Sequence, residues 1–369
     1  MKVALVHYWA LGMRGGERVL EALCRMYPDA DIVMHVADES QLSSTIVRHR
    51  IRKTFIAKLP FAKRFYQRYL PLMPLALELI DLTEYDLVIS CEAGPAKGVI
   101  VRPDALHLCY IHSPMRYIWD QFFVYRRTAG RLTRWMMGPI AHYLRLWDVA
   151  SAARVDRFVA NSSFVASRVR KYYRRDADVV YPPVSVEAFS PCPADEVGDY
   201  YLWVGELVSY KRPDLAVEAF TRNGRRLLVV GDGAERRRLE AAAGPNVSFL
   251  GKLPFAELKT TMAACRALIF PGQEDFGIIP VEVQASGRPV IALGAGGALE
   301  TVVDGETGVI FPEASVASLQ QAVERFERAT WDEAATARCV ANAARFDEAR
   351  FRRGIEAAVD AMRGELAGG

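Results

Sequence analysis

Short apolar runs alternate with helical patterns through both halves of the chain, and this alternation limits the fold more than any other feature. The strand-like runs include KVALVHYW, DIVMHVA, DLVIS, HLCYIH and RFVANS in the first half, and YYLWVGEL, RLLVVGD, ALIFPG and PVIAL in the second. Strands that alternate with helices form parallel sheets covered by helices. The sequence therefore predicts an α/β fold with two doubly wound, Rossmann-like domains.

A proline-rich segment separates the two halves. VVYPPVSVEAFSPCPADEVGD contains four prolines, which interrupt helices and central strands. We therefore expect an N-terminal domain over residues 1–190 and a C-terminal domain over residues 198–345. Residues 346–369 have a helical pattern, and this helix is a candidate to pack back toward the N-terminal domain.

Composition excludes several classes of protein. The chain is 51% hydrophobic and 25% charged, as in soluble globular proteins, and its net charge of +3 does not suggest a nucleic-acid binder. Six cysteines without a CxxC pair argue against a disulfide framework or a thiolate zinc site, and they favour a reducing cytoplasm. No apolar run reaches the ~20 residues that span a bilayer. We predict a cytoplasmic protein that needs no metal.

Open α/β sheets bind ligands beyond the carboxyl ends of their strands, and two such domains facing each other form a cleft there. The loop PGQEDFGIIPVEVQASGRP follows a strand, and Pro280 suits the first position of the next helix. Backbone N–H groups at this positive helix end would bind phosphate; they belong to Phe276, Gly277, Ile278 and Ile279. Glu274 and Glu282 flank the loop and could accept hydrogen bonds from sugar hydroxyls. Alternatively, Glu274 is solvated and Glu282 only complements the helix dipole.

Two other strand-to-helix loops add candidates. Gly15 and Gly16 begin the first helix and would allow a diphosphate to approach the backbone closely. Lys211 lies just before a helix opened by Arg212 and Pro213, where its ammonium could balance phosphate charge. Taken alone, the glycines also fit an ordinary turn and Lys211 fits a solvated lysine.

Three segments together closely resemble family 4 glycosyltransferases of the GT-B fold, a group that includes bacterial mannosyltransferases for O-antigen and exopolysaccharide assembly. The segments are VSYKRPDLAVEAF, EDFGIIPVE and SGRPVIALGAGGALETVVDGETGVIF. The likeness extends over nearly the whole chain. It implies a retaining transferase that uses a nucleoside diphosphate sugar, GDP- or UDP-linked, with no obligatory metal and no cofactor.

The resemblance also implies roles for single residues. Glu274 would contact the donor hexose, Glu282 the ribose hydroxyls, and the amides of residues 276–279 the diphosphate and the sugar. Lys211 would hold the diphosphate, and the segment FLGKLP would meet the nucleobase. The complete set of candidate donor-binding residues is Gly15, Gly16, Glu206, Lys211, Arg212, Gly251, Lys252, Leu253, Glu274, Phe276, Gly277, Ile278, Ile279 and Glu282.

One position departs from the family. Many members carry Gly-Arg where this chain has Gly205-Glu206, so a cation expected beside the diphosphate is missing. A glutamate next to phosphate is unfavourable unless it points away or binds a hydroxyl. Arg212, Arg14 and Arg116 are candidates to replace the missing cation, and the sequence does not choose between them.

The segment LCYIHSPMRYIWDQFF ends a strand of the first domain and resembles the histidine-containing acceptor loop of the family. The candidate acceptor-binding residues are His112, Ser113 and Arg116. In the front-face mechanism proposed for the family, the leaving diphosphate itself can take the acceptor proton, so His112 would assist rather than act as an essential base. A histidine that only caps the strand is the alternative. The candidate catalytic residues are Glu274, His112 and Lys211.

Between Gln41 and Leu77 no acid occurs, while eight basic residues are interleaved with aromatic ones. This mixture suits an anionic membrane surface, and the stretch FFVYRRTAGRLTRWMMGPIAHYLRLW repeats it. The candidate membrane-binding residues are Arg50, Arg52, Lys53, Lys63 and Arg64. A solvated basic face over an aromatic core is the alternative, and nucleic acid is a weaker one because no binding motif accompanies the patch.

These observations predict a peripheral-membrane, retaining glycosyltransferase on the inner face of the cytoplasmic membrane. It would move a hexose, preferably mannose from GDP-mannose, to a polyprenyl-diphosphate-linked saccharide in bacterial surface polysaccharide synthesis. A nucleotide-sugar-binding scaffold without transfer activity is one alternative, which Glu206 leaves open. An NAD-dependent oxidoreductase is less favoured because neither half contains a full GxGxxG motif with its ribose-binding acid.

Overall fold

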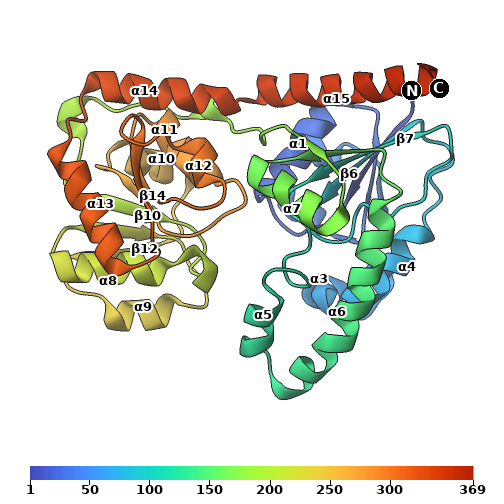
Figure 1. The fold of residues 1–369 in the computed structure, drawn as a ribbon, viewed down its shortest axis with the longest axis horizontal. Coiled ribbons are helices and arrows are strands. Elements are labelled where there is room, and N and C mark those ends of the chain that lie inside the picture. Colours follow the sequence, from blue (N-terminus) through green and yellow to red (C-terminus); the bar gives the residue numbers. More distant parts are fainter. Residues whose placement is uncertain (369) are drawn as a thin grey trace. The chain divides into compact units, whose positions relative to one another are not determined.

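The structure, a computed structural model, describes residues 1–368 and divides into two compact units (Figure 1). Unit 1 combines Met1–Pro183 with the residues from Phe351 onward, and unit 2 is Val184–Arg350. Each unit has its own parallel sheet and its own hydrophobic core. The predicted fold class, two Rossmann-like α/β domains, is confirmed.

The chain enters unit 2 earlier in the proline-rich segment than residue 190. Val184 donates its N–H to the carbonyl of Phe346 (2.9 Å), and the ring of Phe189 packs edge-on against Phe255 at 5.8 Å. Both partners belong to unit 2. These long-range contacts draw the residues after Pro183 into unit 2, although their composition is that of a linker.

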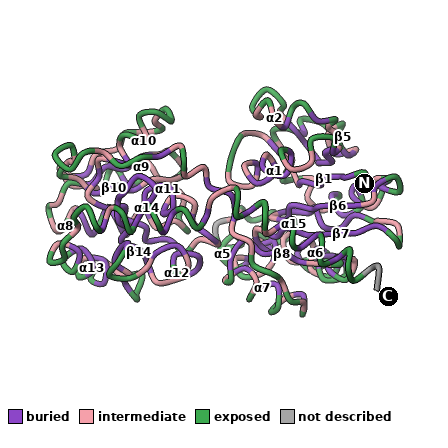
Figure 2. Tube along the Cα trace, turned by 90° about the horizontal axis from the view of Figure 1, so that it is seen from above, coloured by how far each residue is buried: buried purple, intermediate pink, exposed green. Residues whose placement is uncertain are grey.

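Unit 1 is built on seven parallel strands. In spatial order they are β5 (Ile51–Lys53), β3 (Asp31–Met34), β1 (Val3–His7), β6 (Leu87–Glu92), β7 (Leu106–Ile111), β8 (Arg157–Ala160) and β9 (Ala177–Val179), and a separate two-stranded sheet joins β2 (Trp9–Ala10) to β4 (Val36–Ala37). The central strands β1, β6 and β7 are buried along their whole length (Figure 2). Strands covered on both faces need continuous apolar runs, which is what these segments contain.

The helices of unit 1 cover this sheet. They are α1 (Gly15–Met26), α2 (Ser44–Val47), α3 (Ala62–Phe65), α4 (Met73–Glu78), α5 (Phe122–Thr128), α6 (Arg131–Ala152), α7 (Ser163–Tyr173) and the greater part of α15 (Glu348–Gly368). In α15, apolar side chains recur at helical spacing and join the core of unit 1: Phe351, Ile355, Ala358, Val359 and Met362. The ring of Phe351 lies 5.4 Å from that of Tyr110 on β7.

Unit 2 contains six parallel strands. In spatial order they are β12 (Val247–Gly251), β11 (Leu227–Val230), β10 (Tyr201–Val204), β13 (Leu268–Phe270), β14 (Val290–Leu293) and β15 (Gly308–Phe311). The helices are α8 (Pro213–Asn223), α9 (Arg236–Ala242), α10 (Phe255–Ala263), α11 (Ile278–Ala285), α12 (Ala298–Thr301), α13 (Val316–Arg328) and α14 (Glu333–Ala343).

Local sequence explains where several helices of unit 2 begin and end. Pro213 opens α8, and Gly224 ends it in the left-handed conformation (φ 73°). Helix α11 begins at Ile278, directly after Gly277 (φ 89°), so Pro280 is its third residue and not its first as the sequence suggested. Proline is tolerated there because the first four N–H groups of a helix have no partner within it.

The contribution of α15 to unit 1 is testable with Phe351→Ala. Removing this buried ring should destabilise unit 1 by about 3–5 kcal/mol, which urea unfolding followed by circular dichroism would measure. Arg352→Ala is the matched control, since that side chain is exposed and pairs with Glu356 one turn away in the same helix. Equal unfolding midpoints for the two variants would contradict the packing of α15 in unit 1.

Candidate functional site

Four strand-to-helix loops are pressed together at the C-terminal edge of the unit 2 sheet. A Cβ added to Gly231, after β11, would lie 1.8 Å from the carbonyl oxygen of Gly205, after β10. A Cβ on Gly272, after β13, would lie 2.7 Å from the Cα of Lys211. One on Gly296, after β14, would lie 2.3 Å from the carbonyl oxygen of Glu274. Only glycine fits at these contacts, so these residues set how the loops meet.

Within this packing, Lys211 and Glu274 form an ion pair. Their Nζ and Oε1 atoms are 3.1 Å apart, and the two side chains are 18% and 22% exposed. Burial disfavours the charged form of Lys211, but the attraction of Glu274 outweighs it, so the pKa of Lys211 is raised. The structure thus brings together the predicted diphosphate-binding lysine and the predicted hexose-binding acid, and the lysine is held as a cation.

Glu206 and Arg212 lie on either side of this lysine in the sequence. The exposed carboxylate of Glu206 is close enough to raise the pKa of Lys211 further. Arg212 caps α8 in the left-handed conformation (φ 53°), and its guanidinium donates to both carboxylate oxygens of Asp214 (3.1 and 3.2 Å). Arg212 is therefore already paired within unit 2 and is a poor replacement for the cation that Glu206 displaces.

The loop from Glu274 to Gly277 is braced by the glycine-rich segment after β14. The N–H of Gly297 donates to the carbonyl of Glu274 (2.9 Å), and a Cβ on Gly297 would lie 2.2 Å from the carbonyl oxygen of Phe276. The ring of Phe276 is buried against Phe346 at 5.4 Å. Ile278 and Ile279 begin α11, where helix geometry leaves backbone N–H groups free of helical partners. This is the arrangement expected of an anion-binding helix end.

The two predicted acids lie at different depths. Glu274 is partly exposed in the loop, whereas Glu282 lies one turn into α11 and is only 3% exposed. A ligand in contact with both carboxylates would therefore extend from the partly exposed loop to the buried first turns of α11. The proposed ribose contact of Glu282 stays a prediction.

The predicted base-binding segment overlaps the end of β12. Gly251 (φ 70°) accepts a hydrogen bond from the N–H of Gly231 (2.7 Å), which joins this segment to the loop after β11. Lys252 is exposed and Leu253 is half-buried. The guanidinium of Arg236 on α9 lies 3.4 Å from where a Cβ of Gly251 would be. Arg236 was not among the residues predicted from the sequence. The one feature that could have pointed to it is its position directly after the glycine-containing turn GDGAE.

In unit 1, His112 follows β7 directly. Its N–H donates to the carbonyl of Glu92 at the end of β6 (2.8 Å). The Glu92 carboxylate is fixed from within, because it accepts from the backbone N–H groups of Ala96 and Lys97 (2.8 Å each) and lies 3.4 Å from the buried Lys97 ammonium. Burial lowers the pKa of His112 to about 4, so the ring is neutral at pH 7. Among the described residues, its Nε2 has no hydrogen-bond partner.

A second histidine, His7, ends β1 at the same edge and was missed by sequence analysis. Burial, and then the charge of His112, lower the pKa of His7 to about 3. Neither of its ring nitrogens has a hydrogen-bond partner in the described part of the chain, and Glu17 Oε1 lies 4.0 Å from Nε2. His7 could have been predicted as a site residue, because it stands at the carboxyl end of a buried strand, where α/β sheets bind ligands.

The other candidates in unit 1 have structural partners. Gly15 begins α1 as predicted, and a Cβ on Gly16 would lie 2.6 Å from the hydroxyl of Tyr8, so glycine lets this side chain lie against the start of the helix. Ser113 donates to the carbonyl of Pro114 and accepts from Arg168 (2.8 Å each). Its hydroxyl is thus engaged inside unit 1. Arg116 is half-buried in the turn that follows.

Most of the candidate membrane-binding cations are paired with acids from outside their own segment. Lys53 pairs with Glu39 (2.6 Å) and Lys63 with Asp38 (2.9 Å). The others of the set are Arg52, which lies 3.7 Å from Glu84, Arg50, which lies 3.8 Å from Asp31, and Arg64, which lies over the ring of Phe65. Four of the five candidate cations therefore have an acidic partner nearby, and the proposed membrane contact of this segment stays a prediction.

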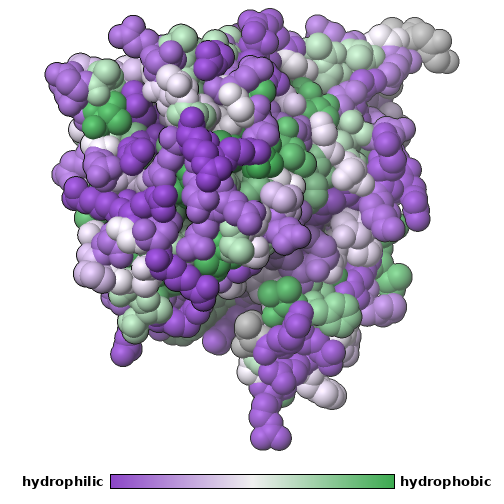
Figure 3. Space-filling view, turned by 60° about the vertical axis from the view of Figure 1, so that its left-hand side comes forward, coloured by the Kyte–Doolittle hydropathy of each residue, from purple (hydrophilic) through white to green (hydrophobic). Residues whose placement is uncertain are grey.

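The hairpin of α5 and α6 (residues 122–152) exposes a different surface. Its exposed apolar side chains include Phe123, Leu132, Trp135 and Leu146, with Leu132 and Trp135 73% and 76% exposed. Exposed arginines accompany them: Arg126, Arg127, Arg131 and Arg134. Figure 3 shows apolar and hydrophilic side chains side by side on this projecting part.

An apolar groove of about 810 Å³ runs along this hairpin. The lining comes from α5, α6, the turn before α5 and the segment around residue 70. It includes Leu70, Tyr117, Phe122, Leu132, Met136 and Ile140. Arg68 and Gln67 are also in the lining. No helix among residues 1–368 is long and apolar enough to cross a membrane.

Within the same described residues, no group of three or more histidines, cysteines or acids is placed to hold a metal ion. The expectation that activity needs no metal stays a prediction.

Two family models match consecutive parts of the chain. The one described as Glycosyltransferase Family 4 matches residues 13–188, and the one described as Glycosyl transferases group 1 matches residues 187–346. The boundary between them falls close to the division between the two units.

Curated relatives match over part of their length. A D-inositol 3-phosphate glycosyltransferase of Mycobacterium tuberculosis is 29% identical over 199 residues, which is 47% of this chain and 41% of that protein. An uncharacterised glycosyltransferase of Methanocaldococcus jannaschii is 29% identical over 162 residues, which is 42% of this chain and 45% of that protein. The matched region is less than half of either relative.

Solved structures resemble the whole chain. Sucrose-phosphate synthase from Thermosynechococcus elongatus has a TM-score of 0.71 at 18% identity, covering 99% of this chain and 100% of that one. HepE of Anabaena in complex with UDP has a TM-score of 0.69 at 16% identity, covering 98% and 100%. At these identities the likeness establishes the fold.

The Lys211–Glu274 pair predicts a measurable titration. In Glu274→Gln the pKa of Lys211 should fall, because burial then acts without the main attraction that opposes it. NMR titration of isotope-labelled lysine side chains would measure this. Glu206→Gln is the matched control and should lower the pKa less, since Glu206 contributes the weaker attraction. A Lys211 pKa that does not respond to Glu274→Gln would contradict the ion pair.

Proposed function

The chain belongs to the family 4 type of glycosyltransferases with the GT-B fold, and we propose that it transfers a hexose from a nucleoside diphosphate sugar with retention of configuration. The observation that carries this proposal is the Lys211–Glu274 pair, held among glycine-packed loops at the C-terminal edge of the unit 2 sheet. Ligands of open α/β sheets bind at this edge.

The charges at this edge suit a diphosphate next to a sugar. A bound diphosphate would replace Glu274 as the partner of the Lys211 ammonium. The N–H groups of residues 276–279 would bind other oxygens of the diphosphate at the start of α11. Glu274 would then be released to accept hydrogen bonds from the hexose hydroxyls. As the bond to the hexose breaks, negative charge grows on the leaving diphosphate, and fixed donors that stabilise it lower the barrier.

His112 would assist through its neutral ring. Because its pKa is about 4, the ring carries no charge at pH 7, and Nε2 can accept a hydrogen bond from a hydroxyl of the acceptor or the transferred sugar. We therefore assign it to positioning and not to phosphate binding. The departing diphosphate would take the acceptor proton.

GDP-mannose is the donor that we propose to test first, on the strength of the resemblance to mannosyltransferases. The HepE structure solved with UDP-glucose, 17% identical to this chain, makes UDP-glucose the second donor to test. A thermal-shift screen against GDP- and UDP-sugars would separate the two.

Glu274→Ala should lower the rate of hexose transfer by about 10- to 150-fold, because it removes a charged acceptor worth about 1.5–3 kcal/mol. The assay follows transfer from the donor that the screen selects, and running it in EDTA also tests metal independence. Glu313→Ala, an exposed acid of unit 2, is the matched control and should leave the rate unchanged. A full rate for folded Glu274→Ala would refute the proposed role.

The position of Glu206 favours a second candidate function, a nucleotide-sugar-binding scaffold without transfer activity. Its carboxylate lies near the cation that should bind phosphate, where it would weaken the donor site. Donor binding by calorimetry, together with no transfer and no donor hydrolysis, would select the scaffold. Release of product with the same anomeric configuration as the donor would select the retaining transferase.

For the acceptor we propose a lipid-linked saccharide, as in bacterial surface polysaccharide synthesis. The apolar groove along the α5–α6 hairpin would hold part of the hydrocarbon chain, and the exposed Trp135 and Leu132 would enter the membrane interface. The neighbouring arginines complement anionic lipid headgroups, each contributing about 1 kcal/mol near the surface. This surface replaces the paired cations Lys53 and Lys63 as the main candidate for membrane contact.

Leu132→Ser/Trp135→Ser should reduce co-sedimentation with anionic phospholipid vesicles at least tenfold, because both side chains are exposed and apolar. The matched control, Lys53→Gln/Lys63→Gln, removes cations that already pair with acids and should change co-sedimentation little. If the lysine variant lost vesicle binding and the Leu132→Ser/Trp135→Ser variant kept it, the membrane contact would lie in the basic segment predicted from the sequence. Undiminished binding by both variants would contradict both surfaces.

A further inference from the structure

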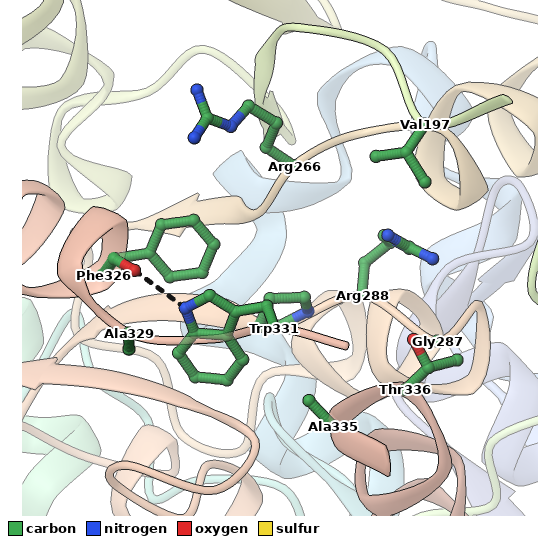
Figure 4. Close-up of a pocket in the computed structure, with 10 residues that line it drawn as sticks. Val197, Arg266, Gly287, Arg288, Phe326, Ala329, Trp331, Ala335 and Thr336 are labelled. Carbon is green, nitrogen blue, oxygen red and sulfur yellow. Dashed lines mark hydrogen bonds between the residues drawn. The ribbon is translucent and has the colours of Figure 1, made fainter. Parts of the chain in front are cut away.

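A cavity of about 240 Å³ lies at the edge of the unit 2 sheet where β10, β13 and β14 begin (Figure 4). Because the strands are parallel, this edge is opposite to the one that carries Lys211 and Glu274. The lining residues are Val197, Arg266, Gly287, Arg288, Pro289, Phe326, Ala329, Trp331, Ala335 and Thr336. Among these lining residues, all in the described part of the chain, are two arginines and no acid.

Arg288 is the unusual member of this lining. It is only 8% exposed, and within residues 1–368 its Nε has no hydrogen-bond partner and no carboxylate forms an ion pair with it. Figure 4 shows the side chain extending from the loop before β14, with Val197 above it and Thr336 below. Its charge also reaches Cys265 and Cys339, whose pKa values burial raises to about 12, so neutral thiols lie near the guanidinium.

The other arginine is already balanced. Nη1 of Arg266 lies 3.2 Å from Asp199 and 3.9 Å from Glu327, and its guanidinium covers the ring of Tyr201. The opposite wall of the cavity is aromatic. Phe326 and Trp331 stack at 4.9 Å, and the indole N–H of Trp331 donates to the carbonyl of Phe326 (2.8 Å).

A buried charge without a partner is costly, and an arginine fork is suited to two oxygens of one phosphate. We propose that this cavity binds a small anion of the phosphate-ester class through Arg288, with the organic part of the ligand against the Phe326–Trp331 wall. The volume of about 240 Å³ is smaller than that of sites for drug-sized ligands and suits a small anion, and the lining combines the two arginines with the aromatic wall. This site is separate from the donor site and can be filled at the same time.

Calorimetric titration of the full chain with inorganic phosphate at constant ionic strength tests the proposal. Lys211→Ala serves as the background, so that the donor site does not contribute. Phosphate should bind to this chain, and adding Arg288→Gln should weaken binding at least tenfold. Adding Arg328→Gln instead, at an exposed arginine of α13, should have no effect. Equal binding with and without Arg288, or no binding to the Lys211→Ala chain, would overturn the proposal.

A second variant keeps the test valid if Arg288→Gln does not fold. Ala335 is in the first turn of α14, where its N–H bonds to the capping side chain of Asp332 (3.0 Å) and an added acid suits the helix dipole. In Ala335→Asp the new carboxylate would enter the cavity and pair with Arg288. Loss of phosphate binding with a raised thermal midpoint would support the site, and unchanged phosphate binding in this variant would overturn it.

Discussion

The close contact of glycine-containing loops in unit 2 determines the surroundings of the Lys211–Glu274 pair, on which the proposed donor site depends. Backbone carbonyls occupy the positions where side chains of Gly231 and Gly296 would be, and this leaves Lys211 and Glu274 in contact in a partly buried setting. Larger residues would force the loops apart and expose the pair to water. In that case the lysine would lose the partner that keeps it charged against burial.

The two units contribute different kinds of polar group. Unit 2 presents a cation between two carboxylates, so an incoming diphosphate competes with acids that are already there. Unit 1 presents His7 and His112, and burial keeps both neutral at pH 7.

Local patterns predicted most of the fold, because continuous apolar runs are needed in strands such as β1, β6 and β7 that are buried on both faces. The glycine loop and Lys211 could also be found, since strand-to-helix loops have a recognisable pattern. Contacts between residues far apart in the sequence could not be predicted, because local patterns carry no information about them. The entry of Val184 into unit 2 depends on Phe346, and the neutralisation of Lys53 and Lys63 depends on acids outside their segment. The buried Arg288 was invisible for the same reason, because its surroundings come from several separate elements.

A crystal structure of the chain with a bound nucleoside diphosphate sugar would show whether Lys211 and the start of α11 hold the diphosphate. We expect diphosphate oxygens within hydrogen-bonding distance of Lys211 Nζ and of the backbone N–H groups of residues 276–279, with Glu274 facing the hexose. A ligand bound elsewhere, with Lys211 and Glu274 still paired to each other, would contradict it.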